Sequence, residues 1–128
     1  MKEVQVDNNN QVILNFDITS NFNAYQFYAR QTAIYPNKNK DLTYVSLGVA
    51  GEAGEICEKI KKVIRDKNGI VDEQTKKEIS KEIGDEIWYL ANLASELGLN
   101  LQDIAKENLI KLYDRMARNK LQGSGDNR

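Results

Sequence analysis

The sequence contains no histidine, and it has only one cysteine and one proline among 128 residues. Without histidine, and with a single thiol at Cys57, a metal site must be built almost entirely from oxygen ligands. Such ligands favour Mg²⁺, Mn²⁺ or Ca²⁺ over zinc, copper or iron. A lone cysteine cannot form an internal disulfide, and the position of Cys57 among apolar helical residues predicts a plain buried thiol.

Long apolar runs and a strong excess of one charge are also missing. The formal net charge is −1, and the 29% of residues that are charged include both signs interspersed. A basic surface for nucleic acid, an apolar membrane span and the start of a signal peptide are therefore not expected. The composition predicts a soluble, cytoplasmic chain, and its length fits a single domain.

The N-terminal segment differs from the rest of the chain. Apolar residues alternate with polar ones on both sides of a polar turn at 7–10, at Val4, Val6, Val12, Leu14 and Phe16. A period of two predicts a possible short β-hairpin within an N-terminal extension of residues 1–21.

Helical periodicity begins after this extension. Four helices are expected: from Asn23 to just before Pro36, from an N-cap at Asp41 to about Asp66, from Asp72 or Glu73 to a C-terminal glycine at Gly98, and from a cap at Asn100 to near Leu121. Long helices joined by short turns predict an all-α, antiparallel four-helix bundle-like domain over residues 22–122, followed by a tail at 123–128.

Three glycines interrupt the second helix at every third position. Gly48, Gly51 and Gly54 each cost about 1 kcal/mol relative to alanine inside a helix. Glycines in such places indicate that another group approaches the backbone closely, or that the helix bends there.

Two pairs of acids lie at helical spacing, Glu52 with Glu55 and Glu82 with Asp85. Residues three apart share one face of a helix, so each pair directs two carboxylates the same way. Like charges packed together destabilise the fold unless a cation neutralises them. If the two helices face each other, the four acids predict a site for a divalent cation.

Polar side chains continue these faces. Lys59 and Lys62 follow the first acid pair, Tyr89 and Asn92 follow the second, and the fourth helix carries a basic line of Asn108, Lys111, Arg115 and Arg118. Acids at one end of a cavity and basic groups at the other suit a metal-bound polyphosphate, and predict phosphoanhydride hydrolysis. A Walker-type phosphate loop is absent from the sequence, so binding is expected to centre on the metal.

Plainer explanations compete with this one. Glu55 with Lys59, and Glu58 with Lys62, are also ordinary ion pairs of an exposed helix face. The chain could therefore be a non-catalytic oligomerisation or regulatory module with a structural cation. A carboxylate-bridged di-iron bundle is a weaker alternative, because its usual ligand motif needs histidine.

At these residues the sequence resembles the MazG-like, all-α nucleoside triphosphate pyrophosphohydrolases. The matching stretches are AYQFYARQTAIYP at 24–36, GVAGEAGEICEKIKKVIRD at 48–66, KEIGDEIWYLANLASELGL at 81–99 and ENLIKLYDRMARNKLQGSGDNR at 107–128. The family signature, E-x-x-E followed after a spacer by E-x-x-D, is met by Glu52, Glu55, Glu82 and Asp85.

The resemblance implies that these four acids bind Mg²⁺, for which Mn²⁺ could substitute, and that a nucleoside triphosphate is split between its α- and β-phosphates. It also implies house-cleaning or control of a nucleotide pool, and a homodimer or homotetramer with active sites near subunit contacts. Many relatives carry a further acid just before the signature, where this chain has Ala50 and Gly51, so Glu55 is taken as the catalytic proton acceptor. The expected substrate-binding residues are Lys59, Lys62, Tyr89, Asn92, Asn108, Lys111 and Arg115.

Overall fold

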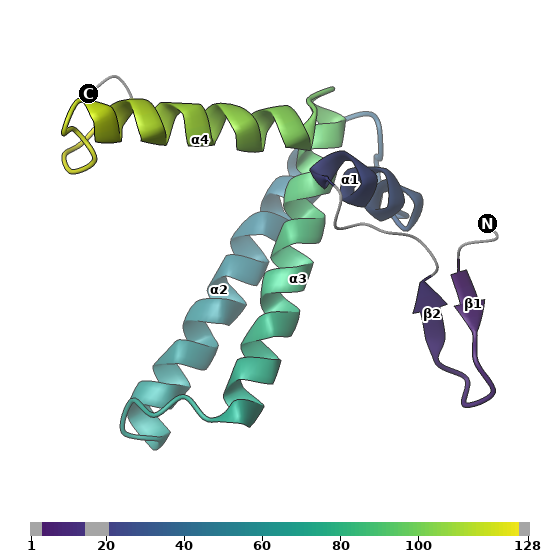
Figure 1. Cartoon of the computed structure of the whole chain (residues 1–128). Helices are drawn as coiled ribbons and strands as arrows, with labels where there is room; N and C mark the ends of the chain where they lie inside the picture. Colours follow the sequence, from purple (N-terminus) through teal and green to yellow (C-terminus); the bar gives the residue numbers. More distant parts are fainter. Residues whose placement is uncertain (1–3, 15–20, 126–128) are drawn as a thin grey trace.

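A computed structural model of the chain describes residues 4–14 and 21–125 (Figure 1). Its elements are β1 (Val4–Val6), β2 (Val12–Leu14), α1 (Phe22–Gln31), α2 (Thr43–Asp66), α3 (Glu73–Glu96) and α4 (Leu101–Ala117). The expected strand position Phe16 and residues 126–128 of the tail lie outside the described residues.

The two strands form an antiparallel ribbon with Gln5 opposite Ile13. The turn between them is closed by Asp7, whose Oδ1 accepts hydrogen bonds from the backbone N–H groups of Asn9 and Gln11, both at 2.8 Å. Asn10 adopts a positive φ of 61°, which asparagine tolerates better than most residues. The ribbon lies beside the helices, away from α2 (Figure 1).

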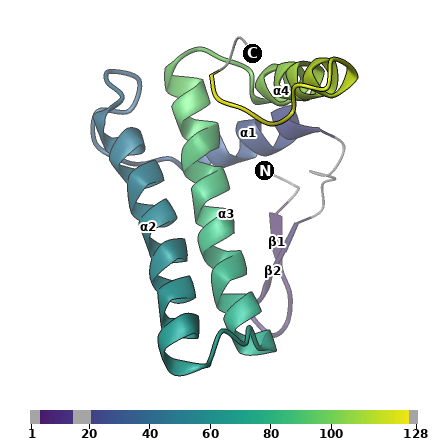
Figure 2. The same cartoon turned by 90° about the vertical axis from the view of Figure 1, so that its left-hand side faces the viewer.

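Helices α2 and α3 form a long antiparallel hairpin, which is the main packing unit of the chain (Figures 1 and 2). The turn between them uses the predicted Lys67–Gly69 segment, in which Asn68 and Gly69 have φ values of 50° and 77°. The N–H of Gly69 donates to the carbonyl of Val63 at 3.1 Å, which satisfies an otherwise unpaired group at the end of α2. A short turn of this kind places the two acid pairs on facing helices.

Both ends of α3 and the start of α4 follow the sequence prediction, whereas α1 ends at Gln31 and α4 at Ala117, earlier than predicted. The side chain of Asp72 accepts from the N–H of Thr75 at 2.8 Å, and that of Asn100 accepts from Asp103 at 3.1 Å. Gly98 takes the left-handed conformation just after α3, with φ of 67°.

The N-cap of α2 differs from the sequence prediction. The cap position is held by Leu42, one residue after Asp41, and α2 begins at Thr43. The carboxylate of Asp41 still accepts a hydrogen bond from the N–H of Thr43 at 2.9 Å. Asp41 therefore satisfies a backbone N–H group at the start of α2, although it lies one residue before the N-cap position.

Helix α1 crosses one end of the hairpin, where a small apolar core of Ala33, Tyr35 and Val45 packs against α3. Helix α4 leaves from the same end, contacts α1 and extends away from the hairpin (Figures 1 and 2). The all-α prediction is confirmed. Within one chain the fourth helix lies across the end of the hairpin instead of alongside it.

Cys57 and the apolar character of the helices bear on two expectations from the sequence. Cys57 is exposed, so the prediction of a buried thiol is wrong. It lies two residues from Lys59, about 200° around α2, and therefore opposite the face that contacts α3. Among the described residues, no helix combines the length and the apolar character that a membrane span needs.

Candidate metal centre

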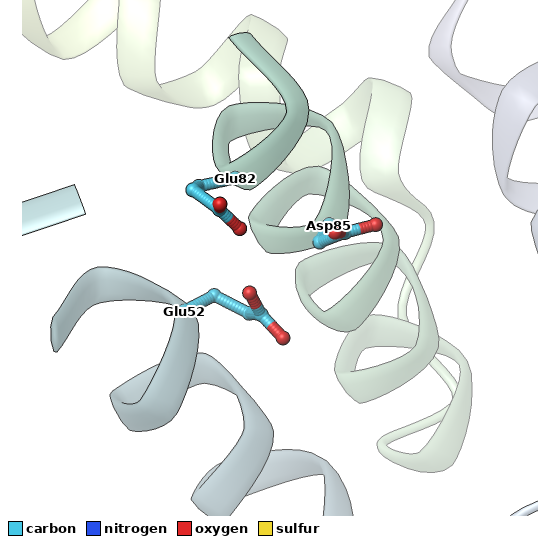
Figure 3. A group of neighbouring side chains, drawn as sticks. All are labelled: Glu52, Glu82 and Asp85. Atoms are coloured by element: carbon cyan, nitrogen blue, oxygen red, sulfur yellow. The ribbon is translucent and has the colours of Figure 1, made fainter. Parts of the chain in front are cut away.

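Three of the four signature acids come together between α2 and α3. Glu52 reaches across from α2 toward Glu82 and Asp85 on α3 (Figure 3). One carboxylate oxygen from each of the three lies within 4.8 Å of the other two. Glu52 and Glu82 are partly buried, and Asp85 is exposed. The antiparallel hairpin therefore assembles an all-oxygen cluster in which Glu52 lies 30 and 33 positions from its two partners.

The electrostatics of this trio, Glu52 with Glu82 and Asp85, are unfavourable without a counter-charge. The pKa of Glu52 is raised, first by its burial and then by neighbouring negative charges. Those charges belong to Asp85, Glu55, Glu82 and Glu86. Carboxylates that repel one another in this way are stabilised by a bound cation.

The basic side chain of Lys59 contacts the trio. The Nζ atom of Lys59 lies 3.0 Å from Oε1 of Glu82, and this ion pair raises the pKa of Lys59. A single ammonium group balances one carboxylate, so the trio keeps a net negative charge. The contact also places Lys59, a predicted phosphate-binding residue, at the site.

Glu86 is a further acid near the trio, outside the residues predicted for the site from the sequence. Its Oε2 atom is buried and has no hydrogen-bond partner among the described residues. A buried carboxylate oxygen without a partner is costly, and its charge is among those acting on Glu52. The signal was present in the sequence, because Glu86 follows Glu82 by four residues and so lies on the same helical face.

Glu55 and Lys62 lie apart from the trio. Glu55 is exposed and is not among the three acids whose oxygens converge. Lys62 is exposed and lies near Glu58, with 3.7 Å between Nζ and Oε1. Their predicted roles, in catalysis and in phosphate binding, stay predictions.

Tyr89 lies beside the trio. Its ring packs edge to face against Trp88, with centroids 5.0 Å apart and an angle of 89°. Burial is the first cause of the raised pKa of Tyr89, followed by the neighbouring Tyr44, Glu52 and Asp85. A phenol with a raised pKa remains protonated and can donate a hydrogen bond.

Asn92, the next residue along that face, is fully buried. Its Oδ1 accepts from Nη1 of Arg30 at 3.1 Å, and its Nδ2 donates to the carbonyl of Trp88 at 3.0 Å. These bonds join Asn92 to a polar network around Glu96, whose carboxylate pairs with Nη2 of Arg30 at 2.8 Å. This network, which residue spacing in the sequence does not reveal, fixes the end of the hairpin next to the site.

The basic line of α4 is separated from the acids within one chain, because α4 extends away from the hairpin (Figure 2). Asn108 is exposed, Lys111 is partly buried and Arg115 is 4% exposed. The guanidinium of Arg115 donates to the carbonyl of Gly125 at 3.4 Å, so the tail folds back over this face.

The donor set of the trio fits a hard divalent cation. With metal–oxygen distances of about 2.3–2.6 Å, Ca²⁺ spans oxygens up to about 5 Å apart, and Mg²⁺, at about 2.1 Å, spans about 4 Å. The observed spacing of up to 4.8 Å fits the Ca²⁺ span and exceeds the Mg²⁺ span by less than about 1 Å, which rotation of the exposed Asp85 side chain can remove. The residues present therefore suit Mg²⁺, Mn²⁺ or Ca²⁺.

Comparison with known proteins identifies the family. The MazG nucleotide pyrophosphohydrolase domain matches residues 41–118, which include α2, α3, α4 and the whole trio. Gene 37 protein of Mycobacterium phage L5 is 44% identical over 109 residues, covering 81% of this chain and 96% of that protein. No solved structure matches the chain significantly. The chain belongs to the MazG nucleotide pyrophosphohydrolase family.

Proposed function

We propose that the chain hydrolyses nucleoside triphosphates between the α- and β-phosphates in a Mg²⁺-dependent reaction, releasing a nucleoside monophosphate and pyrophosphate. The observation that carries this proposal is the convergence of Glu52, Glu82 and Asp85 in a chain of this family. The helical domain at 22–122 is proposed as the functional unit, with nucleotide-pool control as its role.

The trio would hold the cation, which when bound supplies charge neutralisation for the phosphates and a more acidic water. Lys59 lies beside Glu82 and would neutralise part of the triphosphate charge. Glu55 lies outside the trio but is exposed three residues after Glu52 on α2, and it would accept the proton of the attacking water. In this step the water oxygen bonds to phosphorus, the bridging phosphorus–oxygen bond breaks, and pyrophosphate leaves.

The active site is proposed to be completed by a second copy of the chain in a homodimer or homotetramer. Helix α4 carries Lys111 and Arg115 but extends away from the hairpin of α2 and α3 that holds the trio of the same chain (Figure 1). Its apolar side chains Leu109, Ile110 and Tyr113 are more than half exposed. Apolar faces of this kind are commonly covered by a partner subunit, which would bring basic groups close to the acids of its neighbour.

A pyrophosphate-release screen over canonical, deoxy and oxidised nucleotides with Mg²⁺ tests the proposed function. We expect pyrophosphate, not orthophosphate, from at least one nucleotide. The Asp85→Asn variant should lose at least about 100-fold in rate, because loss even of an outer-shell partner of a metal site costs 10–100-fold. Glu55→Gln should lose activity to a similar extent.

Glu58→Gln is the matched control, because Glu58 lies on the same helix but pairs with Lys61 and Lys62 on the exposed side. It should retain activity within about twofold. Release of orthophosphate, or full activity in both the Asp85→Asn and Glu55→Gln variants, would overturn the proposed function.

A further inference from the structure

The three glycines of α2 differ in what surrounds them. A Cβ atom added at Gly48 would overlap three ring carbons of Tyr89, Cδ1, Cε1 and Cζ. At Gly51 and Gly54 nothing lies within 4 Å of the added atom. The close approach to the backbone that the glycine triplet predicts therefore occurs at Gly48 alone, and the approaching group is an aromatic side chain of α3.

The ring of Tyr89 is held from three sides. Gly48 supports it from α2, Trp88 packs against it edge to face at 5.0 Å, and Tyr44 is a close neighbour of its phenol. Tyr44 is itself stacked on Tyr35, with ring centroids 5.3 Å apart and an angle of 8°. A side chain held in this way has little rotational freedom, so its hydroxyl occupies a defined place.

That place is next to the trio. Gly48 precedes Glu52 by four residues on α2, and Tyr89 follows Asp85 by four residues on α3. Because the helices are antiparallel, the contact between Gly48 and Tyr89 lies about one helical turn, or 5.4 Å, from the contact between Glu52 and Asp85. The negative charges of Glu52 and Asp85 also act on the phenol of Tyr89, in agreement with this placement.

We propose that Gly48 is a positioning residue for the reaction: its missing side chain lets the Tyr89 ring lie on α2 and hold the phenol hydroxyl at the rim of the metal site, as a hydrogen-bond donor to the bound triphosphate. The inference rests on the proposed function. It explains why an amino acid that is unfavourable in helices stands at this position.

The test compares Gly48→Ala with Gly54→Ala, which adds the same methyl group to the same helix where nothing is near it. Alanine favours the helix at both positions, so a general effect of the substitution would be shared. Displacement of the Tyr89 ring should lower kcat/KM for pyrophosphate release by about 10- to 100-fold in Gly48→Ala, since a misplacement of about 1 Å can cost 100-fold. Gly54→Ala should stay within about twofold of the unaltered chain.

A second arm asks whether Gly48 acts through Tyr89. In a Tyr89→Ala background the ring is gone, and adding Gly48→Ala should cause less than a twofold further loss of kcat/KM. If Gly48→Ala alone fails to fold, the double variant should fold, because the overlapping ring carbons have been removed. Failure of both to fold, or equal losses with and without the ring, would overturn the inference.

A third arm needs no activity. Trp88 is the only tryptophan, and it contacts Tyr89 directly, so its fluorescence and near-ultraviolet circular dichroism report where the ring lies. The spectra should change in Gly48→Ala and not in Gly54→Ala. Unchanged spectra contradict the placement of the ring, whereas a chain of unaltered sequence that releases no pyrophosphate contradicts only the proposed function.

Discussion

Helix α3 carries carboxylates in two environments that contrast sharply. At one end, Glu96 is 2% exposed in its side chain and is bonded to Arg30, to the hydroxyl of Tyr35 and to the N–H of Asn39. In the middle, Glu82 and Asp85 meet Glu52, and Lys59 pairs with Glu82. A buried carboxylate whose hydrogen-bond partners are in place supports the fold. Clustered carboxylates with more negative charge than their neighbours balance indicate a ligand-binding site.

The pKa values express the same contrast. Burial alone would raise the pKa of Glu96, but the hydrogen bonds from Tyr35, Asn39 and Arg30 outweigh it, and the pKa is lowered. Burial and the carboxylate of Glu96 raise the pKa of Tyr35 to about 12. At Glu52 burial and repulsion act in the same direction, and the pKa is raised.

The largest effect on stability is expected from removing the ionic partner of Glu96. Arg30→Met keeps the aliphatic part of the side chain but leaves Glu96 buried without its ionic partner, which should cost about 3–5 kcal/mol of unfolding free energy. Arg65→Met is the control, because Arg65 pairs with Asp66 on the surface and should change stability by less than about 1 kcal/mol. Urea unfolding measures both. Equal costs in the two variants would remove the distinction between the regions.

An intermediate effect on stability is expected from adding Mg²⁺, which the trio is proposed to bind. Adding Mg²⁺ to about 100 times its dissociation constant should stabilise the chain by about 2.7 kcal/mol, seen as a rise in Tm. Glu52→Gln should abolish this rise and should stabilise the metal-free chain, because it removes one of the mutually repelling charges. A nucleotide should add a further rise in the presence of Mg²⁺. A rise with the cation and none with any nucleotide would favour a non-catalytic module with a structural cation.

The smallest effect is expected in the pH dependence of the metal-free chain. Because its folded pKa is lowered, Glu96 stabilises the fold above its unfolded pKa of 4.5, and this contribution is lost as the pH falls through the folded value. The contribution of Glu52 to stability has the opposite sign, because its folded pKa is raised. Its charge destabilises the fold at neutral pH, and this cost is relieved as the pH falls through the folded pKa toward 4.5.

Urea unfolding from pH 7 to pH 3 measures these contributions. Glu96→Gln should flatten the loss of stability below pH 4.5, and Glu52→Gln should remove a gain as the pH falls toward that value. The same pH profile in both variants would show that the two acids do not differ in the expected way.

Features that depend on residues close together in the sequence could be predicted from it. The helix start at Asp72 or Glu73, the cap at Asn100 and the glycine at Gly98 depend on contacts within four residues, and these predictions are confirmed. The trio also follows from short spacing, since a three-residue repeat and a short turn between two helices bring Glu52 near Asp85.

Longer-range features could not be predicted in the same way. Arg30 and Glu96 are 66 residues apart and look like ordinary surface charges in the sequence. The period of α4 shows that Lys111 and Arg115 share a face, but not which helix that face meets. Glu86 was missed for a different reason, because the signature E-x-x-D ends one residue before it.

The short turn at Lys67–Gly69 also has a kinetic consequence. Both acid pairs belong to one helical hairpin, so their contacts are close in sequence, and local contacts generally form early and fast during folding. The acids would then be brought together before α1 and its distant partner on α3 have docked. A cation present at that moment would stabilise the hairpin itself, so Mg²⁺ should mainly speed folding and change the unfolding rate little.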